Sequence, residues 1–160
     1  MSLSHLFTIG YEGLDIAAFI ARLRDAQVHL IVDVRELPLS RKKGFSKASF
    51  REHLVAAGIA YSHIPALGCP KKIRDQYRAT GDWARYTRDF LAYLHTQDAS
   101  VRELAMQSRT VSACLVCFEA DYLMCHRTYV ARAAQRFGAP VIKHLTAKTA
   151  FLDQPLQAAA

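Results

Sequence analysis

The sequence lacks any long hydrophobic run. No apolar stretch in its 160 residues approaches the length needed to cross a bilayer. Residues 1–5 lack the charged and apolar regions of a signal peptide. Internal repeats, linkers and a second domain are absent as well. We therefore expect one cytoplasmic domain over residues 1–152, followed by a frayed, Ala-rich tail at 153–160.

Cysteine is scarce and unevenly spaced, which argues against a disulfide framework. The chain has four, at Cys69, Cys114, Cys117 and Cys125, and in an intracellular protein of this size we expect thiols. The spacing Cys114-x-x-Cys117 is typical of a metal or redox pair. Residues three apart on a strand, however, point to opposite faces of the sheet. We therefore assign Cys114 to the hydrophobic core.

Acidic residues are few relative to basic ones. The chain contains 21 Lys and Arg against 14 Asp and Glu, a net charge of +7. The excess is concentrated in residues 35–88, which hold twelve basic and four acidic residues. Such a local excess favours an anionic partner, either a phosphate-bearing small molecule or a nucleic acid. The alternative is a solvated basic face that only improves solubility.

Two kinds of apolar segment alternate along the chain. Short apolar runs predict strands at about residues 6–11, 29–35, 59–64, 111–118 and 141–145. Helical spacing predicts helices at about 15–26, 46–57, 82–94, 100–107 and 128–137. Residues 71–80 form only a basic, weakly amphipathic segment. This alternation predicts the α/β class: three layers, with helices on both faces of a mostly parallel, Rossmann-like sheet of about five strands.

Residues at the ends of these segments mark the helix boundaries. Ser46 and Asp82 each precede a helical segment and are suited to cap it. Gly58 stands where a left-handed residue ends a helix. The helix that begins after Asp82 carries an aromatic stripe. These rings are able to stack on nucleic-acid bases, but we assign them to the core.

Polar residues gather where the predicted strands end. The C-terminal ends of parallel strands share one edge of the sheet, so we expect these side chains to line a common crevice. They are Tyr11 and Glu12 after the first strand, Asp33 and Arg35 at the second, His63 at the third, and Glu119, Cys125, His126 and Arg127 at the fourth. A basic loop that contains Ser40 and Arg41 follows the second strand.

Several motifs in these segments also carry a resemblance. They are Thr8-Ile9-Gly10-Tyr11-Glu12-Gly13, Val32-Asp33-Val34-Arg35 with Pro38, Ser40-Arg41 and Gly44-Phe45-Ser46, Tyr61-x-His63-x-Pro65-x-Leu67-Gly68, Gly81-Asp82-Trp83-x-x-Tyr86, and Cys117-x-Glu119 followed by Cys125-His126-Arg127. Together, over about residues 7–137, they resemble the domain-of-unknown-function family 488. The resemblance implies a small bacterial-type α/β protein and no settled reaction or cofactor.

The function that we favour is an enzyme, a hydrolase or transferase, for a nucleotide or nucleic-acid substrate. The predicted catalytic residues are Asp33, Glu119 and Glu12 as general base or nucleophile, His126 as acid or base, and Cys125 as a thiolate at a helix start. The predicted anion-binding residues are Arg35, Ser40, Arg41, Arg127, Tyr11 and His63. The Cys-x₅-Arg spacing of cysteine phosphatases is absent from the segment 117–127, which argues against that class.

Three alternatives remain open. Cys117, Cys125 and His126, with Glu119 or Cys69, include suitable zinc ligands for a metal or redox site. Adjacent residues at a helix start are expected to point in different directions, however, so we predict no cofactor and keep zinc as the less favoured option. A non-catalytic module could instead bind nucleic acid through residues 35–88. Finally, the pairs Asp33–Arg35 and Glu119–Arg127 are also compatible with purely structural ion pairs.

Overall fold

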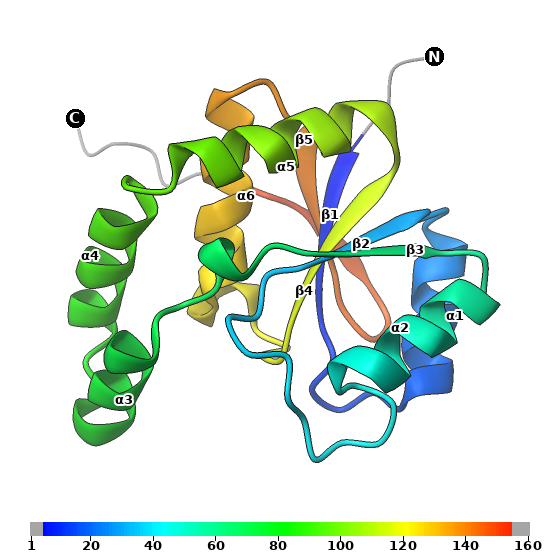
Figure 1. Cartoon of the computed structure of the whole chain (residues 1–160), viewed down its shortest axis with the longest axis horizontal. Coiled ribbons are helices and arrows are strands. Elements are labelled where there is room, and N and C mark those ends of the chain that lie inside the picture. Colours follow the sequence, from blue (N-terminus) through cyan, green and yellow to red (C-terminus); the bar gives the residue numbers. More distant parts are fainter. Residues whose placement is uncertain (1–4, 155–160) are drawn as a thin grey trace.

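Six strands form one sheet in the order β3-β2-β4-β1-β5-β6 in the computed structural model, which describes residues 5–154 (Figure 1). The strands are β1 (His5–Gly10), β2 (Leu30–Asp33), β3 (Ala60–His63), β4 (Ala113–Cys117), β5 (Val141–Leu145) and β6 (Ala150–Leu152). The first five pair in parallel, and β6 runs antiparallel to β5. The predicted α/β class and mostly parallel sheet are confirmed, with β6 as an additional strand.

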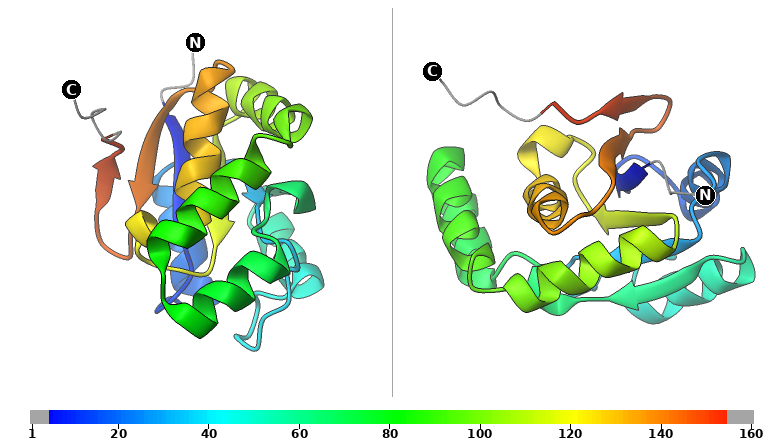
Figure 2. Two further views of the ribbon diagram at one scale, coloured as in Figure 1. Left: turned by 90° about the vertical axis from the view of Figure 1, so that its left-hand side faces the viewer. Right: turned by 90° about the horizontal axis from the view of Figure 1, so that it is seen from above.

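Helices cover both faces of the sheet (Figure 2). They are α1 (Ile16–Asp25), α2 (Lys47–Ala56), α3 (Lys71–Thr80), α4 (Trp83–Leu94), α5 (Asp98–Thr110) and α6 (His126–Arg136), with 3-10 turns η1 (Pro65–Leu67) and η2 (Tyr122–Met124). Buried residues of α1 and α2 pack on one face, and those of α4, α5 and α6 pack on the other. The sheet is thus the middle of three layers.

Alternation along the central strand β4 supplies both cores. Cys114 points to the α1 and α2 side and is fully buried there, as predicted, and burial raises the pKa of its thiol. Its neighbour Leu115 belongs to the core on the opposite face. Every residue of β4 is buried, as expected for a parallel strand with a helical layer on each side.

Two of the three predicted helix boundaries have the expected geometry. The Asp82 carboxylate accepts a hydrogen bond from the Arg85 amide at 3.0 Å and caps α4. Gly58 has φ +78° and ends α2 in the left-handed conformation. Ser46 stands at the N-cap of α2, but its hydroxyl bonds to the backbone of Ser40 instead of the helix. The prediction of a Ser46 side-chain cap was therefore wrong, and the residue closes the preceding loop.

The structure differs from the expected pattern at two further places. Residues 71–80 form a full helix, α3, whose side chains are all at least partly exposed and which packs mainly against α4. Asp153, placed by the sequence in a frayed tail, accepts hydrogen bonds from Arg132 and His144 at 2.9 Å. Residues 1–4 and the rest of the predicted tail, 155–160, lie outside the described residues. No helix within 5–154 is long and apolar enough to cross a bilayer.

Candidate functional site

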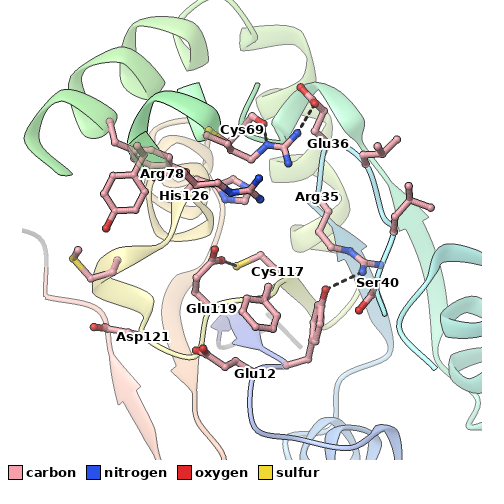
Figure 3. A pocket seen from close by; sticks show the side chains of 18 of the residues that line it. Glu12, Arg35, Glu36, Ser40, Cys69, Arg78, Cys117, Glu119, Asp121 and His126 are labelled. Atoms are coloured by element: carbon pink, nitrogen blue, oxygen red, sulfur yellow. Dashed lines mark hydrogen bonds and ion pairs between the residues drawn. The ribbon is translucent and has the colours of Figure 1, made fainter. Parts of the chain in front are cut away.

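A cavity of about 620 Å³ lies at the C-terminal edge of the sheet, beyond β1, β2 and β4 (Figure 3). From β1 the chain proceeds through α1 to β2 and on to β3 at one edge of the sheet. It then returns to β4, which lies between β1 and β2, and continues to β5 on the other side of β1. The cavity therefore lies where the order of the strands reverses. Open α/β sheets bind ligands at such positions. Six of the predicted catalytic and anion-binding residues line this cavity: Tyr11, Glu12, Arg35, Ser40, Glu119 and His126.

Asp33 and Arg35 form an ion pair at the cavity wall, where Arg35 is part of the lining and Asp33 lies behind it. The Asp33 carboxylate accepts from Arg35 Nε at 2.9 Å and Nη2 at 2.7 Å, and from the Tyr61 hydroxyl at 2.7 Å. The remaining guanidinium nitrogen donates to the Tyr11 hydroxyl and to the Phe45 carbonyl. Burial alone would lower the pKa of Arg35, but the hydrogen bonds and charge of Asp33 outweigh it and raise that pKa. Both carboxylate oxygens and four of the five guanidinium N–H groups are engaged, so this placement disfavours the predicted catalytic role of Asp33 and a phosphate grip by Arg35.

Arg127 is fully buried, and its side chain holds the loop that follows β4. It donates to Thr8 Oγ1 and to Cys117 Sγ, each at 3.2 Å, and to the carbonyl oxygens of Glu119 and Ala120. Burial lowers the pKa of Arg127 to about 10. Within residues 5–154 its guanidinium pairs with no carboxylate, Glu119 included. Arg127 therefore stabilises the loop and is not exposed to an incoming phosphate.

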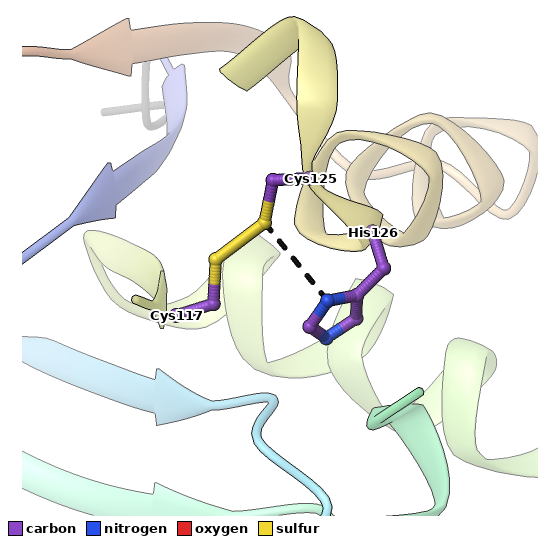
Figure 4. Close-up of side chains that lie close together, drawn as sticks. All are labelled: Cys117, Cys125 and His126. Atoms are coloured by element: carbon purple, nitrogen blue, oxygen red, sulfur yellow. Dashed lines mark hydrogen bonds between the residues drawn. A yellow bond between two sulfur atoms is a disulfide. The ribbon is translucent and has the colours of Figure 1, made fainter. Parts of the chain in front are cut away.

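Cys117 and Cys125 meet beside the cavity, joined as a disulfide (Figure 4). Cys117 ends β4 and Cys125 is the N-cap of α6, so the intervening loop brings the two sulfur atoms together. Cys69 and Cys114 are free. The expectation that all four cysteines are thiols is thus corrected for this pair. So is the expectation that Cys125 and His126 diverge, because Cys125 Sγ lies 3.9 Å from His126 Nδ1.

His126 has a defined tautomer. Its Nε2 lies 2.7 Å from the carbonyl oxygen of Val34, and a carbonyl only accepts, so Nε2 carries the proton. The second ring nitrogen, Nδ1, is left with a lone pair that faces the sulfur atoms. Burial lowers the pKa of His126 to about 4, so the ring is neutral at neutral pH.

Glu119 differs from the other acids that line the cavity. Three of them have firm partners: Glu12 accepts from the Ala120 amide, Glu36 pairs with Arg74, and Asp121 accepts from the Leu123 amide. Glu119 makes no ion pair within the described part of the chain, and one of its carboxyl oxygens lies 3.4 Å from Cys117 Sγ. Burial raises the pKa of this carboxyl. Its side chain is the acid best placed to exchange a proton with a bound molecule.

One wall of the cavity is aromatic, and the sequence did not assign it to the site. Trp83 and Tyr86 of α4 stack with ring centroids 4.6 Å apart, and Tyr77 of α3 contacts both edge-on or tilted. The stripe on α4 was assigned to the core, which is correct for Phe90 but incomplete for Trp83 and Tyr86. The sequence signal that could have placed these rings near the site was Gly81, which lies between the two helical segments. In the structure Gly81 has a left-handed φ of +67°, and the turn there brings α3 back along α4.

Three predicted residues lie at or beyond the edge of the cavity. Ser40 lines it, with its hydroxyl accepting from the Lys42 amide at 3.1 Å. Arg41 is exposed on the same loop and lies outside the lining. His63 is half-buried, bonded through Nε2 to the carbonyl of Arg35 at 2.8 Å, and is likewise outside the lining. His63 thus supports the segment that follows β2.

The fold and the cavity define a three-layer α/β protein with a ligand-sized site at its C-terminal strand ends. The chain belongs to the family described as Domain of unknown function DUF488, whose model matches residues 15–134. The match begins after the first motif, at residues 8–13, and includes the other motifs on which the resemblance was based. No curated protein and no solved structure matches the chain.

Proposed function

We propose that the protein is an enzyme that acts on a nucleotide or nucleic-acid substrate, with the base inside the cavity and the phosphates outside it. The observation that carries this proposal is the pairing of an aromatic wall with the carboxyl of Glu119 in one cavity. A volume of about 620 Å³ is typical of sites for small molecules. Aromatic rings stack on bases of any sequence and contribute about 1–3 kcal/mol per base.

Two basic segments flank the opening and are suited to phosphates. The loop between β2 and α2 and the helix α3 lie at the same end of the sheet (Figure 1). Exposed cations on them include Arg41, Lys43, Lys72 and Arg78. Because the guanidinium groups of Arg35 and Arg127 are occupied, we assign the phosphate contacts to these surface cations, whose attraction is long-range and weakened by salt.

Glu119 acts in this proposal as the general acid and base. In a hydrolysis, its carboxylate takes a proton from a water molecule as the water oxygen bonds to an electrophilic atom of the bound nucleotide. The bond to the leaving group then breaks, and the proton passes from Glu119 to that group. This assignment depends on the position of the carboxyl inside the cavity, and on the firm partners of the other three acids.

Trp83 provides a direct test of base binding, because it is the only tryptophan in the chain and it lines the cavity. We expect AMP or CMP to quench its fluorescence at concentrations where inorganic phosphate and ribose 5-phosphate do not. Equal quenching by phosphate alone, or none by any nucleotide, would overturn base binding in this cavity.

Turnover is tested with a panel of nucleosides, their 5′-phosphates and short oligonucleotides, with products followed by mass spectrometry. Glu119→Gln should abolish turnover while the unfolding temperature and Trp83 quenching stay unchanged. Glu103→Gln, an exposed acid on α5 far from the cavity, is the matched control and should retain full activity. Binding without turnover of any panel member by the unmodified protein would identify a nucleic-acid-binding module instead of an enzyme.

A further inference from the structure

Three potential metal ligands converge at the rim of the cavity. The ligand atoms of Cys117, Cys125 and His126 all lie within 4.8 Å of one another, and all three residues are buried (Figure 4). Cys117 and His126 also line the cavity. Two cysteines and a histidine form a common donor set for zinc, and three protein ligands leave a fourth position open.

The orientation of His126 matches that of a metal-binding histidine. Such a ring donates one N–H to a carbonyl or carboxylate, which fixes the tautomer and directs the other nitrogen at the ion. Here the Val34 carbonyl takes the Nε2 proton at 2.7 Å, and the lone pair of Nδ1 faces Cys125 Sγ. The imidazole is therefore already positioned as a ligand.

The surroundings of the two sulfur atoms suit thiolates. The Arg127 guanidinium donates to Cys117 Sγ at 3.2 Å, and the Arg127 amide lies 3.5 Å from Cys125 Sγ. Arg127 is a fully buried cation with no carboxylate partner in residues 5–154, and buried charges require an opposite charge. In the reduced, metal-free protein a thiolate at Cys117 supplies it.

We propose that in the reduced protein Cys117, Cys125 and His126 bind a divalent transition-metal ion of the zinc class. The two thiolates are ligands of the ion, and Arg127 donates to one of them. The fourth coordination position lies on the side of Glu119 and the cavity, where a water molecule completes the coordination. This site goes beyond the nucleotide-directed function proposed above and does not depend on it.

The disulfide must be reduced before the two sulfur atoms can bind a metal ion. A phosphine reductant, with one water molecule, converts the Cys117–Cys125 disulfide into two thiols and is itself oxidised to the phosphine oxide. Each divalent ion then displaces the two thiol protons. Metal binding is therefore expected only after reduction, and it should weaken as the pH falls.

Cobalt titration tests the site, because thiolate-bound Co²⁺ has a charge-transfer absorption that zinc abolishes on displacing it. Protein reduced with a phosphine and freed of metal should develop this absorption with an end point near one ion per chain. Cys117→Ser, Cys125→Ser and His126→Gln should each lower the affinity at least tenfold. Cys69→Ala and Cys114→Ala are the matched controls and should titrate like the unmodified protein, because neither side chain is one of the three ligands.

Several outcomes would overturn the proposal. Reduced protein that shows no cobalt absorption, or absorption that persists unchanged in Cys117→Ser with Cys125→Ser, excludes the site. Equal loss in Cys114→Ala excludes it as well. If a cysteine variant unfolds, His126→Gln and zinc-dependent protection of Cys117 and Cys125 from alkylation decide the question. None of these readouts requires a nucleotide, so the two proposals fail or succeed separately.

Discussion

Two buried arginines lie near β4 at the same edge of the sheet, and their partners differ. Arg35, after β2, meets the carboxylate of Asp33 through two hydrogen bonds, and both residues are at most 8% exposed. Arg127, on α6, meets a sulfur, a hydroxyl and two carbonyl oxygens. The first centre is electrically complete, whereas the second has one positive charge in excess. The difference indicates that the Arg35 centre stabilises the fold and that the Arg127 centre is the better candidate for a ligand-binding site.

The largest effect is expected from breaking the complete centre. Arg35→Met leaves the Asp33 carboxylate buried and without its cation, which costs about 3–5 kcal/mol of unfolding free energy. Glu36→Gln breaks the half-exposed pair with Arg74 and, as the control, should cost about 1 kcal/mol or less. Urea unfolding measures both. If Arg35→Met lowered the unfolding free energy by less than Glu36→Gln does, the assignment of this centre to stability would be contradicted.

Two glycines allow the two centres to be disturbed separately. A Cβ at Gly10 would lie 1.8 Å from the carbonyl oxygen of Glu119, and one at Gly68 would lie 2.1 Å from the amide of Glu36. Because both neighbours are backbone atoms, we expect Gly10→Ala and Gly68→Ala each to cost about 1–3 kcal/mol in urea unfolding. Only Gly10→Ala moves the loop beside Cys117, so only that variant should also weaken cobalt binding. Equal weakening by Gly68→Ala would show that the two centres are not separate.

The sequence predicts these centres only in part, for reasons visible in particular residues. Apolar runs and helical spacing are local signals, and they placed β5 at the observed residues and the Asp82 cap correctly. Helix α3 lacks a buried face and depends on α4, so its own sequence carries little signal. The meeting of Cys117 with Cys125 depends on the path of a loop without a regular pattern, and the pairing of Arg127 with sulfur depends on β1, β4 and α6 together.

A smaller effect is expected at the Arg127 centre. Arg127→Met removes the guanidinium that donates to Cys117 Sγ, and residues that support metal ligands usually contribute 10–100-fold to affinity. We expect cobalt affinity of the reduced protein to fall within this range, and Arg127→Lys to recover part of the loss because it restores a cation. Affinity is measured by titration at a temperature where circular dichroism shows each variant folded. An unchanged affinity in Arg127→Met would indicate that the excess charge does not serve the sulfur pair.

The smallest effect concerns a chain of hydrogen bonds that runs from Arg127 to the end of the described chain. Arg127 donates to Thr8 Oγ1, Thr8 donates to His144 Nδ1 at 2.7 Å, and His144 Nε2 donates to Asp153 at 2.9 Å. This direction requires a neutral His144, and burial lowers its pKa even though Asp153 opposes the shift. The unfolded chain therefore binds a proton that the folded chain does not, beginning near the ordinary value of about 6.5.

Stability should accordingly be greatest above that value and should fall as the pH drops from about 6.5 toward the lowered pKa of folded His144. The expected loss at this residue is the smallest of the effects considered, because burial and the charge of Asp153 shift its pKa in opposite directions. His144→Gln removes the titrating group, so its unfolding free energy should change less between pH 7 and pH 5 than that of the unmodified protein. His95→Gln, an exposed histidine directly after α4, is the matched control and should keep the original slope. If His144→Gln keeps that slope too, the pKa of His144 is the same in the folded and unfolded chains, which contradicts the lowering of its pKa by burial.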